Sequence, residues 1–145
     1  FTRLGNIVNI KGRNLDAGDG ASNGAGKSTI IEALVYGLYG KLIKGLSHKE
    51  AINIRSKKGL EVEVHWDDYK VIRRRAPDRL QLWKGDKEIS LGGIPATDEL
   101  IRSIVRLNHN SFINIACFGQ HNSYNFLSCN AIEKRQIAEN LLNLD

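Results

Sequence analysis

The sequence predicts an α/β fold in which a helix behind a glycine-rich turn lies beside an antiparallel β meander. The turn occupies Asn23–Thr29, and the apolar residues that follow, Ile30–Tyr39, have the composition of a buried helix. Three strand candidates come next at short intervals: Leu60–Trp66, Tyr69–Arg75, and Leu80–Trp83 running on to Ile89. With 145 residues, 41% of them apolar, the chain has the length of one domain and enough apolar material for one core.

Turn residues fix the ends of these elements. Gly40 is placed to end the helix, since glycine adopts the left-handed backbone of a C-cap. Asp67-Asp68, Ala76-Pro77-Asp78 and Lys84-Gly85-Asp86 separate the strands of the meander. Upstream, Asn6–Ile10 alternates weakly and suits an edge strand, so we expect a mixed sheet around the helix.

The second half of the chain predicts three further elements. Thr97 is the expected N-cap of a helix with an apolar stripe through Val105, ending near Leu107-Asn108. Ser111–Gly119 is strongly apolar and is predicted to be a buried strand. Ala131–Leu144 is predicted to be an amphipathic helix, and Ser90–Gly93 a loop.

The glycine-rich turn has the residue types of a phosphate-binding loop. Glycines leave backbone N–H groups free to point at phosphate oxygens, and the helix start adds its positive end. Lys27 would reach the β- and γ-phosphates, Ser28 would ligate Mg²⁺, and Thr29 would lie near the α-phosphate. The expected nucleotide-binding residues are Asn23, Gly24, Ala25, Gly26, Lys27, Ser28 and Thr29.

Two features depart from the usual pattern of such loops. Ala21 stands where a glycine is usual, and the preceding residues, Asn14–Gly20, cannot form the buried strand that normally leads into the loop. We therefore expect that the chain lacks residues around Asp16–Gly20. Because it also has no methionine and stops at Asp145 within a predicted helix, it reads as a fragment.

The net charge and the cysteine content indicate less about the function than the loop does. A formal net charge of +5 fits contact with nucleic acid and an ordinary basic surface equally well. Cys117 and Cys129 have no metal-ligand spacing, which favours two free thiols in a reducing compartment. No apolar run has the length of a membrane span, so we expect a soluble protein of the cytoplasm, or of the nucleus in a eukaryote.

A succession of motifs carries a family resemblance. The loop is followed by Ile30-Ile31-Glu32-Ala33-Leu34, then by Ala51-Ile52-Asn53, Ser111-Phe112, Gly119-Gln120, Phe126-Leu127 and Glu133-Lys134-Arg135. This order resembles the N-terminal half of a Rad50/SbcC-type head of the ABC ATPase superfamily, over nearly the whole chain. The layout is most similar to that of the large subunit of phage recombination nucleases.

The resemblance implies a P-loop NTPase lobe over residues 1–130 and the start of a coiled-coil helix over 131–145. It implies that Gln120 is catalytic and a metal residue, closing on Mg²⁺ and the attacking water. It also implies ATP and Mg²⁺ as cofactors, and as partners a second copy, the chain's own C-terminal lobe, an Mre11/SbcD-like nuclease and double-stranded DNA. An SMC-like ATPase that clamps DNA without a nuclease is the alternative.

Arg73-Arg74-Arg75 on the second strand suggests DNA contact. Alternation along a strand sends Arg73 and Arg75 to one face and Arg74 to the other. A solvated sheet edge with one or two structural ion pairs is the competing interpretation.

Overall fold

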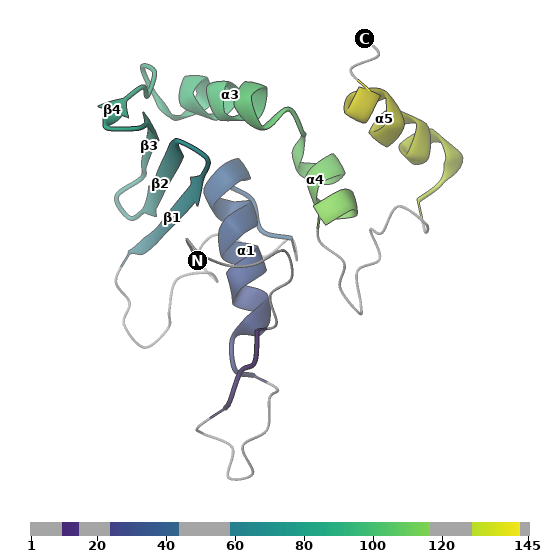
Figure 1. Cartoon of the computed structure of the whole chain (residues 1–145), viewed down its shortest axis with the longest axis horizontal. Coiled ribbons are helices and arrows are strands. Elements are labelled where there is room, and N and C mark those ends of the chain that lie inside the picture. The colour runs from purple at the N-terminus through teal and green to yellow at the C-terminus, as the bar shows by residue number, and fades with distance from the viewer. Residues whose placement is uncertain (1–9, 15–23, 44–58, 117–128, 143–145) are drawn as a thin grey trace.

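The computed structural model of the chain describes residues 10–14, 24–43, 59–116 and 129–142 (Figure 1). Its elements are α1 (Lys27–Tyr39), β1 (Leu60–Trp66), β2 (Tyr69–Arg75), β3 (Arg79–Lys84), β4 (Lys87–Glu88), α3 (Ile94–Val105), α4 (His109–Ala116) and α5 (Ala131–Leu142). Asn6–Asn9, where an edge strand was expected, and Asp16–Gly20 lie outside the described residues. None of the described helices is both long and apolar enough to cross a membrane.

The meander forms a four-stranded antiparallel sheet in the order β1-β2-β3-β4. β1 and β2 have their predicted bounds, and the turn at Gly85 divides the third predicted strand into β3 and β4. Val64, Val71 and Leu82 are paired across the strands and point into the core. All pairings between the described strands are antiparallel, so the mixed sheet expected around α1 remains a prediction.

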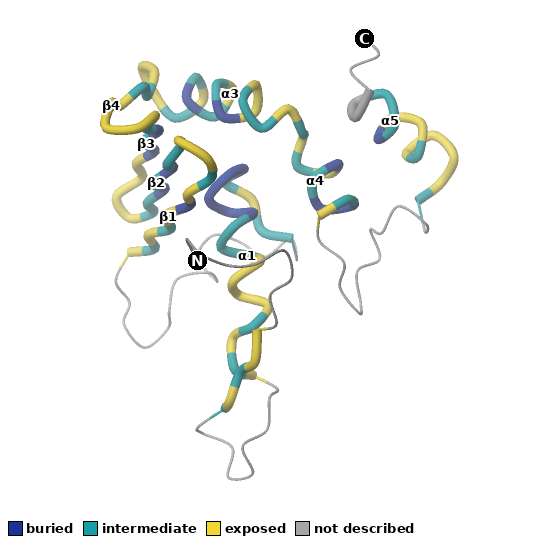
Figure 2. The backbone as a smooth tube through the Cα atoms, in the orientation of Figure 1, coloured by how far each residue is buried: buried dark blue, intermediate teal, exposed yellow. Residues whose placement is uncertain are grey.

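Helix α1 packs across this sheet and ends where the sequence predicted. Gly40 adopts the left-handed backbone, with φ 65°, and its N–H donates to the carbonyl oxygen of Tyr36. The sequence predicted a helix buried on several sides, and its fully buried residues are Val35–Tyr39, in the C-terminal half. Ile30 and Ile31, near its start, are 38% and 39% exposed. Figure 2 shows this change from exposed to buried along α1.

A buried arginine joins α1 to the sheet and to α3. The side chain of Arg73 on β2 donates from Nε to the carbonyl oxygen of Gly37 (3.0 Å) and from Nη2 to Asp98 Oδ1 (2.5 Å). Only 7% of the Arg73 side chain is exposed. Arg74 and Arg75 instead pair with Glu61 and Asp78. All three arginines thus form ion pairs, more than the one or two that the competing interpretation expected, and β2 lies between β1 and β3, not at a sheet edge. Contact of these arginines with DNA stays untested.

The N-cap predicted for α3 is wrong. The helix starts at Ile94 with Gly93 as its N-cap, three residues before Thr97. Pro95 lies in the first turn, where the missing N–H of proline costs nothing and its fixed φ suits the helix. Thr97 is buried and its hydroxyl accepts a hydrogen bond from the N–H of Leu91 (3.0 Å).

The buried strand predicted over Ser111–Gly119 is also wrong in its described part. Residues His109–Ala116 form α4, begun by Asn108, whose Oδ1 accepts a hydrogen bond from the N–H of Ser111 (2.8 Å). A short apolar run fits a buried strand and a buried helix equally well, and the capping asparagine decides for the helix. The end of α3 at Val105 is likewise two residues earlier than expected.

The predicted C-terminal helix begins at Ala131 as expected. Asn130 and Glu133 cap it reciprocally: the N–H of Glu133 donates to Asn130 Oδ1 (2.9 Å), and the N–H of Asn130 donates to Glu133 Oε2 (3.0 Å). Ile137 is buried, and α5 lies against α4.

Gly37 is the closest point between α1 and the sheet. A Cβ added there would overlap Val64 Cγ2 and lie 3.3 Å from Val62 Cγ1. We predict that Gly37→Ala lowers the free energy of unfolding by about 1–3 kcal/mol despite the better helix propensity of alanine, because the β-branched valines cannot turn away. Urea unfolding measures the effect. Gly92→Ala, with nothing within 4 Å of the added Cβ, is the control; equal stabilities of the two variants would contradict the prediction.

Candidate functional site

The described part of the glycine-rich loop has the backbone that its glycines predict. Gly24 and Gly26 both have positive φ, 76° and 79°. Residues with a Cβ rarely adopt a positive φ without strain, so the backbone of the loop requires glycine at both positions. Gly26 is also the N-cap of α1, and the N–H of Thr29 donates to its carbonyl oxygen (3.1 Å). The turn therefore leads directly into the helix.

The start of α1 is suited to an anion. Gly26 offers no side-chain cap, and the first turn contains no acidic residue. The first backbone N–H groups of the helix therefore keep their partial positive charge, which attracts anions to this end. Lys27 adds a full positive charge at the first helical position.

Lys27, Ser28 and Thr29 form the first turn of α1. Lys27 is half-buried, whereas Ser28 and Thr29 are exposed. Their hydroxyls are thus accessible beside the uncapped end of the helix. Glu32 lies one turn later on α1, and its Oε2 accepts a hydrogen bond from the N–H of Ile43 (2.8 Å).

The segment 10–14 lies against the loop, a contact that no feature of the sequence predicts. A Cβ on Gly12 would come 2.7 Å from Ala25 Cβ and 3.1 Å from Lys27 Cγ. The Asn14 side-chain nitrogen would lie 3.2 Å from a Cβ on Gly24. Gly12 therefore permits the close approach of this segment to the loop. No sequence motif marks it.

Two predicted site residues are not placed by the structure. Asn23 and Gln120 lie outside the described residues, so the distance from Gln120 to the loop stays untested. The described residues contain no group of three His, Cys, Asp or Glu side chains that could hold a metal ion. A serine hydroxyl beside a triphosphate needs no such group, because the phosphates supply the other oxygens. The loop thus fits a nucleotide with Mg²⁺.

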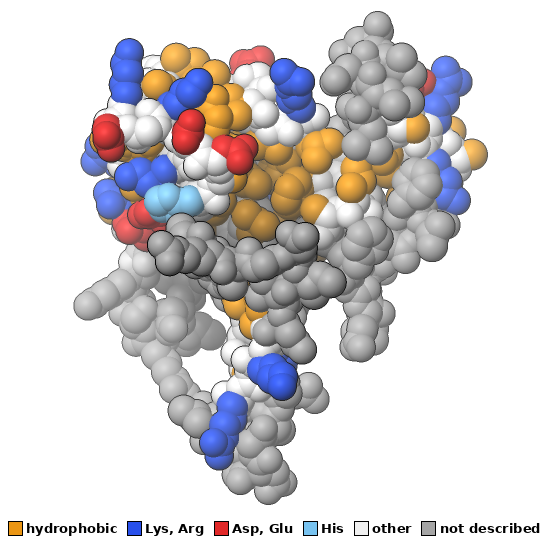
Figure 3. Space-filling model, viewed as in Figure 1, with side chains coloured by type: hydrophobic (Ala, Val, Ile, Leu, Met, Phe, Trp, Pro, Cys, Tyr) orange, Lys and Arg blue, Asp and Glu red, His pale blue; other side chains and the backbone are white. Residues whose placement is uncertain are grey.

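The charged side chains over the sheet differ from those around the start of α1. In Figure 3, acidic and basic side chains alternate over the sheet, whereas the visible charged side chains around the start of α1 are Lys and Arg. Lys11, Arg13 and Lys27 are the described charged residues near this end. A local excess of positive charge raises the concentration of a polyanion such as a nucleotide.

Comparisons with known proteins identify the family of this chain. The sequence profile of the AAA domain family matches residues 20–145. Exonuclease subunit 2 of Escherichia phage RB69 is 31% identical over 135 residues, covering 83% of this chain and 22% of the phage protein. The DNA double-strand break repair Rad50 ATPase of Methanocaldococcus jannaschii is 30% identical over 129 residues, covering 85% and 12% of the two chains.

A bacterial relative aligns with the whole chain. The SbcC component of the SbcCD nuclease of Treponema pallidum is 27% identical over 167 aligned positions, which cover 100% of this chain and 15% of the relative. Since the chain has 145 residues, this alignment includes positions that the chain lacks. The chain spans between 12% and 22% of the lengths of these relatives.

The profile match covers most of the chain, which therefore belongs to the AAA domain family. Within that family it is of the Rad50/SbcC type, as the order of its motifs indicated.

Proposed function

We propose that this chain is the N-terminal lobe of the ATPase head in a DNA double-strand-break repair and recombination nuclease complex. The observation that carries the proposal is the loop itself, in which two left-handed glycines lead into a helix that starts at Lys27 without a side-chain cap. Uncapped N–H groups, a helix N-terminus and a lysine form a site for phosphates. The names of the relatives, a Rad50 ATPase and two nuclease subunits, support the biological setting.

Each site residue has a proposed role. The backbone of Asn23–Gly26 surrounds the phosphates, and the Lys27 ammonium neutralises the β- and γ-phosphate oxygens. Ser28 ligates Mg²⁺, which supplies charge neutralisation between the phosphates, and Thr29 contacts the α-phosphate side. Gln120 orients the attacking water and contacts the metal, since an amide oxygen can accept from water or ligate a cation.

The proposed head is completed by parts outside this lobe. Residues 1–130 form the lobe, and 131–145 begin a coiled coil that connects to the C-terminal lobe of the same protein. Two heads close on two ATP molecules, and closure controls how double-stranded DNA reaches an Mre11/SbcD-like nuclease. The exposed Ile30 and Ile31 on α1 fit a lobe that packs against further protein, because large apolar side chains gain free energy when covered.

Lys27→Ala tests the nucleotide site. We predict that ATP affinity of the full-length protein falls by roughly 10- to 100-fold, because charge-assisted hydrogen bonds contribute about 1.5–3 kcal/mol each. Isothermal titration calorimetry with Mg-ATP measures it. Lys87→Ala removes an exposed lysine on β4 and is the matched control. Unchanged affinity in Lys27→Ala would refute the assignment of the loop.

Gln120→Ala separates binding from hydrolysis. We predict nearly unchanged ATP affinity and a turnover at least 100-fold slower, because a residue that orients water acts mainly in the chemical step. Steady-state and single-turnover assays on the full-length protein give the two values. Equal losses of affinity and turnover would contradict the proposed role.

Association with a nuclease tests the setting. We predict that the full-length protein co-purifies with the Mre11/SbcD-like phosphoesterase of the same source, and that a variant truncated in its coiled coil beside the head does not. Failure of the intact protein to bind the phosphoesterase, with ATPase activity retained, would favour an SMC-like DNA clamp instead.

A further inference from the structure

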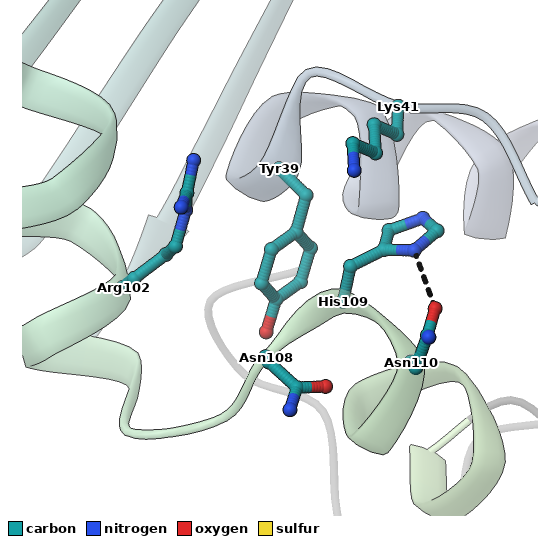
Figure 4. Close-up of a pocket in the computed structure, with 6 residues that line it drawn as sticks. All are labelled: Tyr39, Lys41, Arg102, Asn108, His109 and Asn110. Atoms are coloured by element: carbon teal, nitrogen blue, oxygen red, sulfur yellow. Dashed lines mark hydrogen bonds between the residues drawn. The ribbon is translucent and has the colours of Figure 1, made fainter. Parts of the chain in front are cut away.

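A cavity lies at the opposite end of α1 from the loop. It has a volume of about 230 Å³ and is lined by Tyr39, Lys41, Arg102, Asn108, His109 and Asn110 (Figure 4). These residues come from the end of α1, the last turn of α3 and the start of α4. Lys27 and Tyr39 are twelve residues apart on α1, which corresponds to about 18 Å. The cavity is therefore separate from the proposed nucleotide site.

Among the described residues, the positive charge that lines the cavity exceeds the negative charge near it. Lys41 and Arg102 line it, and in the part of the chain that the structure describes neither forms an ion pair. Glu32, the acidic side chain that influences His109, accepts a hydrogen bond from the N–H of Ile43. In Figure 4 the Lys41 ammonium points into the space between the rings of Tyr39 and His109.

The imidazole of His109 provides the second observation. Its Nδ1 lies 3.3 Å from Asn110 Oδ1, so Nδ1 carries the proton and donates. Its Nε2 is buried and has no hydrogen-bond partner. A buried polar atom without a partner costs about 1–3 kcal/mol, so native structures seldom contain one. The ring of His109 therefore lies beside the cavity with one nitrogen that the described residues leave unpaired.

A purely structural role for Lys41 and Arg102 explains fewer of these observations than anion binding does. Arg102 lies in the last turn of α3, where a positive charge complements the carbonyl end of the helix. That role accounts for one cation. It accounts neither for Lys41 beside the same space nor for the buried, unpartnered Nε2 of His109.

We propose that this cavity binds a phosphate group, held by Lys41 and Arg102 beside the ring of His109. One water occupies about 30 Å³ in the liquid, so the cavity has room for the five heavy atoms of a phosphate and some water. The same chemistry would serve a phosphodiester of a DNA strand or free inorganic phosphate. The proposal does not depend on ATP binding at the loop.

Binding to this cavity should depend on pH. Burial lowers the pKa of His109 from its usual value, and Lys41 lowers it further, whereas Asn110 and Glu32 raise it. Among the described residues, Arg102 and Tyr39 also line the cavity beside the ring. A bound anion raises the pKa of His109, because it stabilises the protonated imidazole. By linkage, affinity is highest at low pH and falls as the pH rises through the pKa of the complex.

Histidine NMR on the full-length protein tests the proposal, with the His109 signal assigned from H109Q. Inorganic phosphate, and sulfate as an anion of constant charge, should raise the His109 pKa by at least half a unit relative to chloride at equal ionic strength. The shift should disappear in the double variant K41Q/R102Q and persist in the double variant R79Q/K87Q, whose changes lie on exposed β3 and β4 residues. An unchanged pKa with both anions, or an equal loss in both double variants, would overturn the proposal.

A second experiment, with DNA, identifies the source of the phosphate. Fluorescence anisotropy measures binding of a short single-stranded oligonucleotide, with the loop variant K27A included. If DNA is the source, K41Q/R102Q should weaken binding at least fivefold more than R79Q/K87Q, and K27A should not. If the oligonucleotide binds all variants equally while phosphate still shifts His109, free phosphate is the ligand. K27A retains the His109 response in either case, which separates this test from that of the nucleotide site.

Discussion

The hydrogen bonds of the buried Arg73 guanidinium fix the position of α1, and the positions of both proposed sites follow from it. From β2 it reaches the carbonyl oxygens of Gly37 and Leu38 at the end of α1 and the carboxylate of Asp98 on α3. Removing one partner of such a buried pair typically costs about 3–5 kcal/mol, because the other charge is left unpaired. Arg73 therefore anchors the C-terminal half of α1 to the sheet.

This anchoring leaves the other end of α1 clear of the core. The buried residues Val35–Tyr39 pack on the sheet, while the first turns, with Ile30 and Ile31, are exposed (Figure 2). The loop and the uncapped N–H groups are consequently at the exposed end of a helix whose other end is held by the sheet. The cavity around His109 lies at the other end, where α1 meets α3 and α4. One helix thus relates two regions that carry positive charge.

The sequence predicted those parts of the fold that have a distinct local signal. β1 and β2 follow from alternation bounded by turns, and the end of α1 follows from the left-handed preference of Gly40. Two predictions failed where one pattern fits two structures. The start of α3 was set by Pro95, not Thr97, and the apolar run after Asn108 became α4.

The functional residues, like the fold, were predictable only where a local sequence pattern is distinct. The Gly-Lys-Ser-Thr motif identifies the loop because its chemistry requires those residues in consecutive positions. Nothing in three successive arginines distinguishes the buried Arg73 from Arg74, which depends on which face of β2 meets α1. Gly12 and the cavity around His109 bring together residues far apart in sequence, so only the folded chain identifies them.

Hydrogen–deuterium exchange of the full-length protein, with and without Mg-ATP, tests the central claim most directly. Phosphates that accept from the backbone of the loop should slow exchange at the amides of Gly24–Thr29, whereas the amides of β1 to β3 should be unaffected. Unchanged exchange at Gly24–Thr29 under saturating Mg-ATP would contradict the account.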